Sequence, residues 1–354
     1  MARYPLAKKQ VAFVASVLEM VGTRGWQGRL ASLWHRYMEE FSDKTESTQK
    51  LYISKFRTSV KDAFAELEDE DKRKGMIDQV IGYIAFPDGL NESLYAQYQT
   101  KVKDRSRNLT VVENYREIVA LFTEMLEDES IRVKALAVMM LTGRRFFEVM
   151  TTADFTPVFQ ERDRGKVRHK YLLAFAGQAK TREAEGTKFG ESFRIPCLAP
   201  AADIMAAVDI IRHSPEGRRW RTFDSTEMNA AESGRMNQML RGLLAAERIS
   251  EPELVKGFTI KQMRSLYAEI AYEVFAPKTF SKAAYFSQIL GHATDDIKTS
   301  LSYMNYVLGS GEESITKAQA EIQGAIEQAN AVDAAFEAGK SSGPDDSAVI
   351  DEDD

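Results

Sequence analysis

Apolar residues recur at intervals of three and four positions through the first hundred residues, as on one face of a helix. No run alternates convincingly at period two, so strands are not expected here. A charged cluster at 68–75 is interpreted as a turn, and Pro87 ends the last apolar segment. We therefore expect residues 1–98 to form a domain of four or five helices. Its apolar segments are 11–21, 30–41, 51–67 and 76–86.

A polar, basic stretch at 99–110 follows and has no periodic apolar face. We expect it to be a linker between two domains. Composition alone favours a plain solvated loop, but its cations could also lie along the phosphates of a nucleic acid. These cations are Lys101, Lys103, Arg105 and Arg107.

A second domain is expected over residues 111–310, where helical spacing returns. Two short strand-like runs, 170–180 and 191–199, are joined by a charged, glycine-containing segment and predict a small antiparallel hairpin. The fold class is therefore mainly α with a small antiparallel sheet in the second domain. Its predicted helices are 111–128, 131–143, 201–213, 236–247, 261–275 and 283–291.

The end of the chain differs in composition from the rest. An alanine-rich segment at 311–340 predicts one more helix, and residues 341–354 are expected to be a disordered acidic tail. Residues 311–354 carry a net charge of −10, whereas the whole chain carries −6. The first 310 residues are therefore mildly basic, which is compatible with DNA binding without requiring it.

Several classes of protein are disfavoured by the sequence. No apolar run is long enough to span a membrane, the N-terminus does not resemble a signal peptide, and Cys197 is the only cysteine. The four histidines are far apart, and no phosphate-binding glycine loop is present. We expect a cytoplasmic protein with no cofactor and no metal.

Candidate chemistry is confined to basic and aromatic residues at the boundaries of the predicted elements. Taken one at a time, each has an ordinary structural explanation, such as a solvated helix end or a core aromatic residue. The set comprises Arg144 and Arg145 after a helix break, Lys180 at the hairpin tip, Lys261 and Arg264 one turn apart, His292 after a Leu-Gly pair, and Tyr303 and Tyr306.

The order and spacing of these residues resemble the motifs of the tyrosine recombinases. LTGRRFFEV at 141–149 resembles the family's T-G-x-R-x-x-E segment, and GQAKTR at 177–182 resembles its lysine-bearing hairpin. TIKQMR at 259–264 stands where the family has H-x-x-R, LGH at 290–292 matches its third motif, and DIKTSLSYMNY at 296–306 matches the segment of the nucleophile. The resemblance covers about residues 112–310 and implies a two-domain DNA clamp.

Two departures from the common pattern indicate a branch of this superfamily. Lys261 replaces the usual histidine of H-x-x-R, and a residue other than histidine at this position resembles the telomere resolvases. Tyr303 lies eleven residues beyond His292, which an insertion at 293–296 would explain, and Tyr306 is the alternative nucleophile. The chain therefore looks most like a telomere resolvase, an enzyme that seals replicated telomeres as hairpins.

The resemblance also implies a role for each residue. Arg145 and Arg264 would hold the scissile phosphate, with His292 and Lys261 as further donors and Glu148 orienting Arg145. Lys180, with Lys188 as the alternative, would protonate the departing oxygen, and Tyr303 would form the covalent ester.

The implied partner is double-stranded DNA with an inverted-repeat site, bound by a homodimer in the nucleoid. Two alternatives stay open. An integrase or site-specific recombinase would exchange strands between duplexes, and a non-catalytic helical DNA-binding protein would not need Tyr303.

Overall fold

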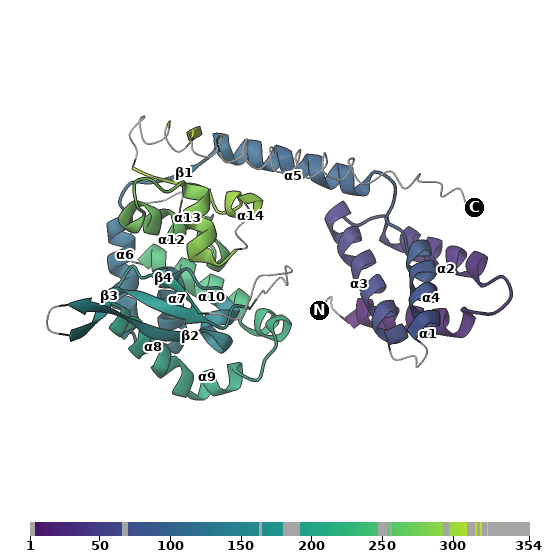
Figure 1. Cartoon of the computed structure of the whole chain (residues 1–354), viewed down its shortest axis with the longest axis horizontal. Coiled ribbons are helices and arrows are strands. Elements are labelled where there is room, and N and C mark those ends of the chain that lie inside the picture. The colour runs from purple at the N-terminus through teal and green to yellow at the C-terminus, as the bar shows by residue number, and fades with distance from the viewer. Residues whose placement is uncertain are drawn as a thin grey trace, which may run out of the picture. The chain divides into compact units, whose positions relative to one another are not determined.

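The chain divides into two units, 1–101 and 102–354, and each is described by itself. The computed structural model describes residues 4–65, 70–162, 165–179, 192–246, 257–292 and 297–309, with isolated positions elsewhere (Figure 1). The predicted helix at 311–340 and the acidic tail lie outside the described residues, apart from isolated positions. None of the described helices is both long and apolar enough to cross a membrane.

Helices make up the described part of the first unit. An aromatic cluster holds them together, with Phe13 in edge-on contact with Trp34 and Phe56 at centroid distances of 5.6 and 5.1 Å. These rings are buried, as the apolar spacing predicted. The helices are α1 (Tyr4–Met20), α2 (Trp26–Phe41), α3 (Glu46–Ala65), α4 (Glu70–Tyr83) and α5 (Leu90–Arg107), which continues into the second unit.

Two segments differ from the sequence prediction. Residues 70–75, expected to lie in a turn, form the start of α4. Residues 99–107, expected to belong to a linker without regular structure, continue α5. Both segments are rich in Lys, Arg, Glu and Gln, which favour helix even where no apolar face exists. The helix propensity of these residues therefore explains why both segments are helical although neither has an apolar periodicity.

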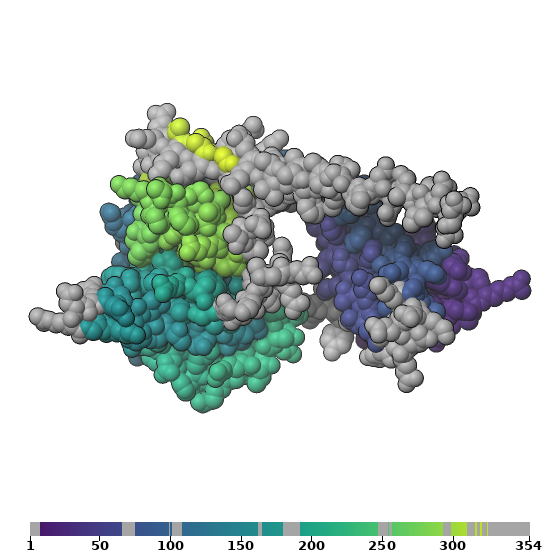
Figure 2. Space-filling model, viewed as in Figure 1, coloured from purple at the N-terminus to yellow at the C-terminus, as the bar shows by residue number. Residues whose placement is uncertain are grey.

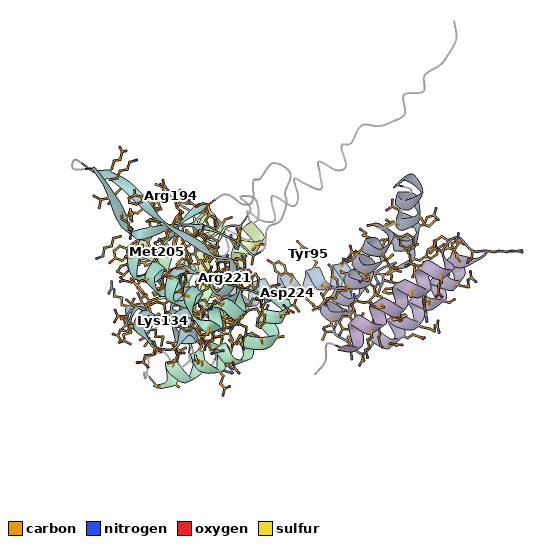
Figure 3. The ribbon with its side chains drawn as sticks, turned by 90° about the horizontal axis from the view of Figure 1, so that it is seen from below. Tyr95, Lys134, Arg194, Met205, Arg221 and Asp224 are labelled. Atoms are coloured by element: carbon orange, nitrogen blue, oxygen red, sulfur yellow. The ribbon has the colours of Figure 1, made fainter. Side chains whose placement is uncertain are left out.

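The second unit is built around α7 (Ile131–Thr142), whose residues from Val133 to Thr142 are all buried. Lys134, labelled in Figure 3, donates a hydrogen bond from its Nζ to the Leu126 carbonyl, so this buried polar group has a partner inside the core. Around α7 lie α6 (Tyr115–Glu124), η1 (Met125–Glu127), α8 (Ala201–His213), α9 (Pro215–Trp220), α10 (Ser225–Ala246) and α12 (Ile260–Phe275).

A three-stranded antiparallel sheet, in the order β2-β3-β4, lies beside these helices. Its strands are β2 (Asp154–Arg162), β3 (Gly165–Ala176) and β4 (Phe193–Pro196). The predicted hairpin corresponds to β3 and β4, whereas β2 was missed. Pro157 lies in β2, where the register shifts, and a proline ordinarily argues against a strand.

The last described elements of the second unit pack against its sheet and pair with its first strand. Helix α13 (Lys282–Leu290) packs against β4, and Figure 2 shows the light-green surface around it directly above the teal surface of the sheet. After the short α14 (Ile297–Leu301), β5 (Tyr306–Leu308) pairs in parallel with β1 (Thr110–Val112). This pairing brings the first and the last described strands of the unit together.

Candidate active site

The C-terminal end of α7 forms the floor of the site. Gly143 ends the helix with φ of 65°, and a Cβ there would lie 2.1 Å from Cδ1 of Tyr267. Only glycine meets both demands. The Gly143 carbonyl accepts a hydrogen bond of 2.5 Å from Nη1 of Arg264, and Nη2 of Arg264 donates to the Leu290 carbonyl at 2.5 Å. Arg264 thus ties α12 to the ends of α7 and α13.

Arg144 and Arg145 are neighbours in sequence but occupy different environments. Arg144 is buried, donates to the Ile289 carbonyl at 2.5 Å, and lies over the rings of Phe175 and Phe193. Burial, followed by the charge of Arg264, lowers the pKa of Arg144 to about 9. Arg144 therefore serves as a charged packing residue of the core, a role that the sequence did not reveal.

Arg145 is partly exposed and is held by Glu148. Its backbone N–H donates to Oε2 of Glu148 at 2.8 Å, and its Nη1 donates to Oε1 at 2.6 Å. Burial opposes ionisation of Glu148, but Arg144, Arg264 and Arg145 outweigh it and lower its pKa to about 2. Oε1 also accepts the backbone N–H of Ala179 at 3.1 Å. One carboxylate therefore fixes both Arg145 and the strand end that precedes Lys180.

Tyr303 lies beside these cations. The guanidinium carbon of Arg264 is 5.5 Å from the centre of its ring, and the His292 ring is 5.1 Å away. Burial raises the pKa of Tyr303, but Arg264, through its charge and a hydrogen bond, together with Arg145 and Lys261, brings it below its ordinary value. A phenol in this setting loses its proton more readily, which is what a nucleophile requires.

His292 follows the left-handed residue Gly291 at the end of α13. The Nδ1 atom of His292 lies 3.4 Å from Oγ of the buried Ser300. The carbonyl of the preceding Gly291 accepts a 2.6 Å hydrogen bond from Nε2 of Gln178. Gln178 and Ala179 together therefore connect the end of β3 to both the Glu148 and the His292 sides of the site. The sequence had pointed only to the lysine that follows them.

The remaining predicted residues have different positions. Lys261 lies exposed in the first turn of α12 and is close enough to Tyr303 to affect its pKa. Tyr306 is buried in β5, and burial raises its pKa. Lys180, Lys188 and the insertion at 293–296 lie outside the described residues. Lys101, Lys103, Arg105 and Arg107 lie on the last turns of α5, and their side chains lie outside the described part.

The charges that converge here suit an anionic group. Arg145, Arg264 and Lys261 are cations, and Glu148 is the carboxylate that lies among them. Among the described residues, no cluster of three or more His, Cys, Asp or Glu side chains could hold a metal ion. Guanidinium groups bind the oxygens of a phosphodiester well, so a phosphodiester suits the cations beside Tyr303.

Residues 108–306 match the family model described as the telomere resolvase ResT/TelK catalytic domain, which is more than half of the chain. The chain belongs to this family of telomere resolvases. The match begins just before β1 and ends at the first residue of β5, so it contains every described residue of the candidate site.

Known proteins resemble this telomere resolvase family member along most of its length. It is 24% identical over 349 residues to the protelomerase of Klebsiella oxytoca phage phiKO2, covering 88% of this chain and 49% of that protein. It is 26% identical over 247 residues to telomere resolvase ResT of Borreliella burgdorferi, covering 69% of this chain and 49% of that protein. The chain thus spans about half the length of the curated relatives it matches.

Solved structures agree with this assignment. Protelomerase tela covalently complexed with substrate DNA is 27% identical, with a TM-score of 0.73 over 87% of this chain and 90% of the other. A variant of the same protein complexed with DNA hairpin product is 26% identical, with a TM-score of 0.74 over 90% and 93%. These likenesses establish the predicted fold class, mainly α with a small antiparallel sheet.

Proposed function

We propose that this chain cuts and rejoins DNA through a 3′-phosphotyrosyl bond to Tyr303 and converts replicated telomeres into hairpin ends. The observation that carries the proposal is the position of Tyr303, which lies against Arg264 and His292 with its pKa lowered. Membership of the telomere resolvase family favours hairpin formation over exchange between separate duplexes.

In the first step, Tyr303 Oη bonds to the scissile phosphorus, loses its proton, and displaces the 5′ oxygen of the next nucleotide. Negative charge then builds up on the non-bridging oxygens, and Arg145 and Arg264 stabilise it with His292 and Lys261 as further donors. Removing one such preorganised donor typically costs about 3–4 kcal/mol of transition-state stabilisation. Glu148 keeps Arg145 in place without touching the phosphate.

The departing oxygen leaves as a hydroxyl once it receives a proton, and we assign that donation to Lys180, with Lys188 as the alternative. The 5′ hydroxyl of the opposite strand then attacks the phosphotyrosyl phosphorus and gives up its proton. The bond from phosphorus to Tyr303 Oη breaks, Tyr303 leaves and takes up a proton, and the hairpin is closed. Bond energy is conserved in the ester, so the cycle consumes no nucleotide and needs no metal.

Double-stranded DNA with an inverted-repeat site is the proposed partner. Cutting both strands requires two copies of Tyr303, so we propose a homodimer on DNA. We assign residues 1–98 to DNA binding, 99–110 with Lys101, Lys103, Arg105 and Arg107 to a basic connection along phosphates, and 111–310 to catalysis. A protein acting on such DNA would work in the nucleoid of the cytoplasm.

The test incubates the whole chain with end-labelled duplexes of replicated inverted-repeat telomeres in the presence of EDTA. Denaturing gels, run with and without protease digestion, report covalent adducts and hairpin products. We expect wild type to give protease-sensitive adducts and hairpins. Tyr303→Phe should give neither while still binding the duplex, and Tyr306→Phe should behave as wild type.

Other outcomes would indicate a different activity or a different nucleophile. Adducts followed by exchanged arms would indicate an ordinary recombinase or integrase. Adducts that persist in Tyr303→Phe and vanish in Tyr306→Phe would identify Tyr306 as the nucleophile. Tight binding without adducts on any palindromic substrate would indicate a non-catalytic DNA-binding protein.

A further inference from the structure

Glu148 belongs to an unusual turn of the backbone. Residues Glu148–Thr152 form a π-helical turn, η2, in which the Ala153 N–H donates to the Glu148 carbonyl at 2.7 Å. Such wide turns are rare and are frequently found at functional sites. This turn lies between the end of α7, where Arg145 begins the site, and β2, and so sets the direction of the Glu148 carboxylate.

Arg212 holds the open end of this turn. It lies in the last turn of α8, and its Nη2 donates to the Ala153 carbonyl at 2.7 Å and to the Val149 carbonyl at 3.3 Å. The last carbonyl groups of a helical turn lack partners within the turn. The Arg212 guanidinium therefore supplies the hydrogen bonds that the backbone of η2 cannot make itself.

The surroundings of Arg212 disfavour the charged form of its guanidinium. Its Nε is buried and has no hydrogen-bond partner among the described residues. Burial and then Arg221, labelled in Figure 3, lower the pKa of Arg212, and Asp154 opposes the shift. The side chain of Arg212 is half-buried, and packing alone would not require a guanidinium there. The guanidinium is instead directed at η2.

We propose that Arg212 is a positioning residue for catalysis, acting through η2 and Glu148 to set the guanidinium of Arg145 on the scissile phosphate. Arg212 reaches Val149 and Ala153, and the carboxylate of Glu148 reaches Arg145 Nη1 at 2.6 Å. This path consists of contacts within the protein and does not require Arg212 to touch DNA. This inference rests on the proposed function, because it assumes that Arg145 contacts phosphate.

The test compares Arg212→Met and Arg212→Lys with a matched control, Arg218→Met. Arg218 also donates through its guanidinium to a helix-end carbonyl, that of His213 at 2.7 Å, but it forms no hydrogen bond with η2 in the described part of the chain. Single-turnover strand cleavage is measured on a palindromic duplex that wild type cuts. It is repeated with each diastereomer of a duplex that carries a methylphosphonate at the scissile position. The methyl group removes the charge that Arg145 would neutralise.

On the ordinary phosphodiester, Arg212→Met should cut about 10- to 100-fold more slowly than wild type, because small misplacements of a catalytic group have effects of that size. Arg212→Lys should recover part of this rate, and Arg218→Met should match wild type. On at least one methylphosphonate diastereomer, Arg212→Met should cut nearly as fast as wild type.

An equal defect of Arg212→Met on all substrates would overturn the inference, because a general loss of structure does not depend on the charge of the phosphate. The same conclusion would follow if Arg218→Met shared the defect. In both cases wild-type cleavage would leave the proposed function intact. Failure of wild type to cut any palindromic duplex would overturn the proposed function and this inference with it.

Discussion

The guanidinium of Arg264 lies 5.5 Å from the centre of the Tyr303 ring while its two terminal nitrogens donate to the carbonyl groups of Gly143 and Leu290. Those two hydrogen bonds come from the ends of α7 and α13, so the cation cannot swing away from the tyrosine. The charge acts through a buried, weakly screened environment, where electrostatic effects are larger than in water. Under the proposed function, this position would let Arg264 act on both the tyrosine nucleophile and the phosphate.

Replacing Arg264 should change the pH dependence of cleavage. A cation stabilises tyrosinate, so its removal in Arg264→Met should raise the pKa of Tyr303 from its lowered value. The rising limb of the cleavage rate should then move to higher pH, and the plateau should fall by about 10²–10³-fold. Single-turnover rates across pH measure both effects. An ultraviolet titration of each protein, with and without Tyr303→Phe, measures the phenol itself, and an unchanged titration would contradict the assignment.

The two adjacent arginines should respond differently to the same substitution. Arg144→Met removes the hydrogen bond to the Ile289 carbonyl and the contact with the Phe175 ring, so it should lower the free energy of unfolding by about 1–3 kcal/mol. Arg145→Met should leave most of the stability and slow cleavage by about 10²–10³-fold. Urea unfolding and single-turnover cleavage of both variants give the comparison. The reverse pattern would exchange their roles.

Gly143→Ala should be strongly destabilising, because the new Cβ meets the Tyr267 ring at 2.1 Å and the left-handed φ of 65° adds strain. The strain alone costs about 1–3 kcal/mol. Gly165→Ala is the matched control, since Gly165 also has a positive φ but nothing lies within 4 Å of its added Cβ. Calorimetric unfolding should show the larger loss at Gly143. Equal losses would mean that the ring moves aside freely.

Much of the site could be predicted because its motifs lie at element ends. A helix that breaks at Gly143 exposes the next residues in a known direction, and the spacing of Arg264, His292 and Tyr303 placed them on successive elements. Sequence order cannot say which of two adjacent arginines faces inward. That choice between Arg144 and Arg145 depends on Phe175 and Phe193, which come from strands distant in sequence.

The missed features share a physical cause. Strand β2 was not predicted; it contains Pro157, which ordinarily argues against a strand, and its pairing with β3 is a tertiary contact. Arg212 can donate its hydrogen bonds at η2 only because α8 lies beside the end of α7. The periodicity of the sequence does not encode that arrangement of helices. Local patterns therefore identified the candidate residues, whereas the residues that support them could be found only in the folded structure.

Glu148 should link the stability of the second unit to pH. Its folded pKa of about 2 lies below the ordinary 4.5, so its ionised form contributes stability that is fully present above about pH 4.5 and is lost as pH falls through about 2. A shift of this size corresponds to roughly 3 kcal/mol. Glu148→Gln should therefore unfold more easily than wild type at neutral pH, and the difference in unfolding free energy should shrink steadily below about pH 4.5. Urea titrations of both proteins at several pH values between about 2 and 7 measure that difference directly. A difference in unfolding free energy that does not change with pH would contradict this prediction. Only a carboxylate that titrates with a lowered pKa makes that difference shrink in acid.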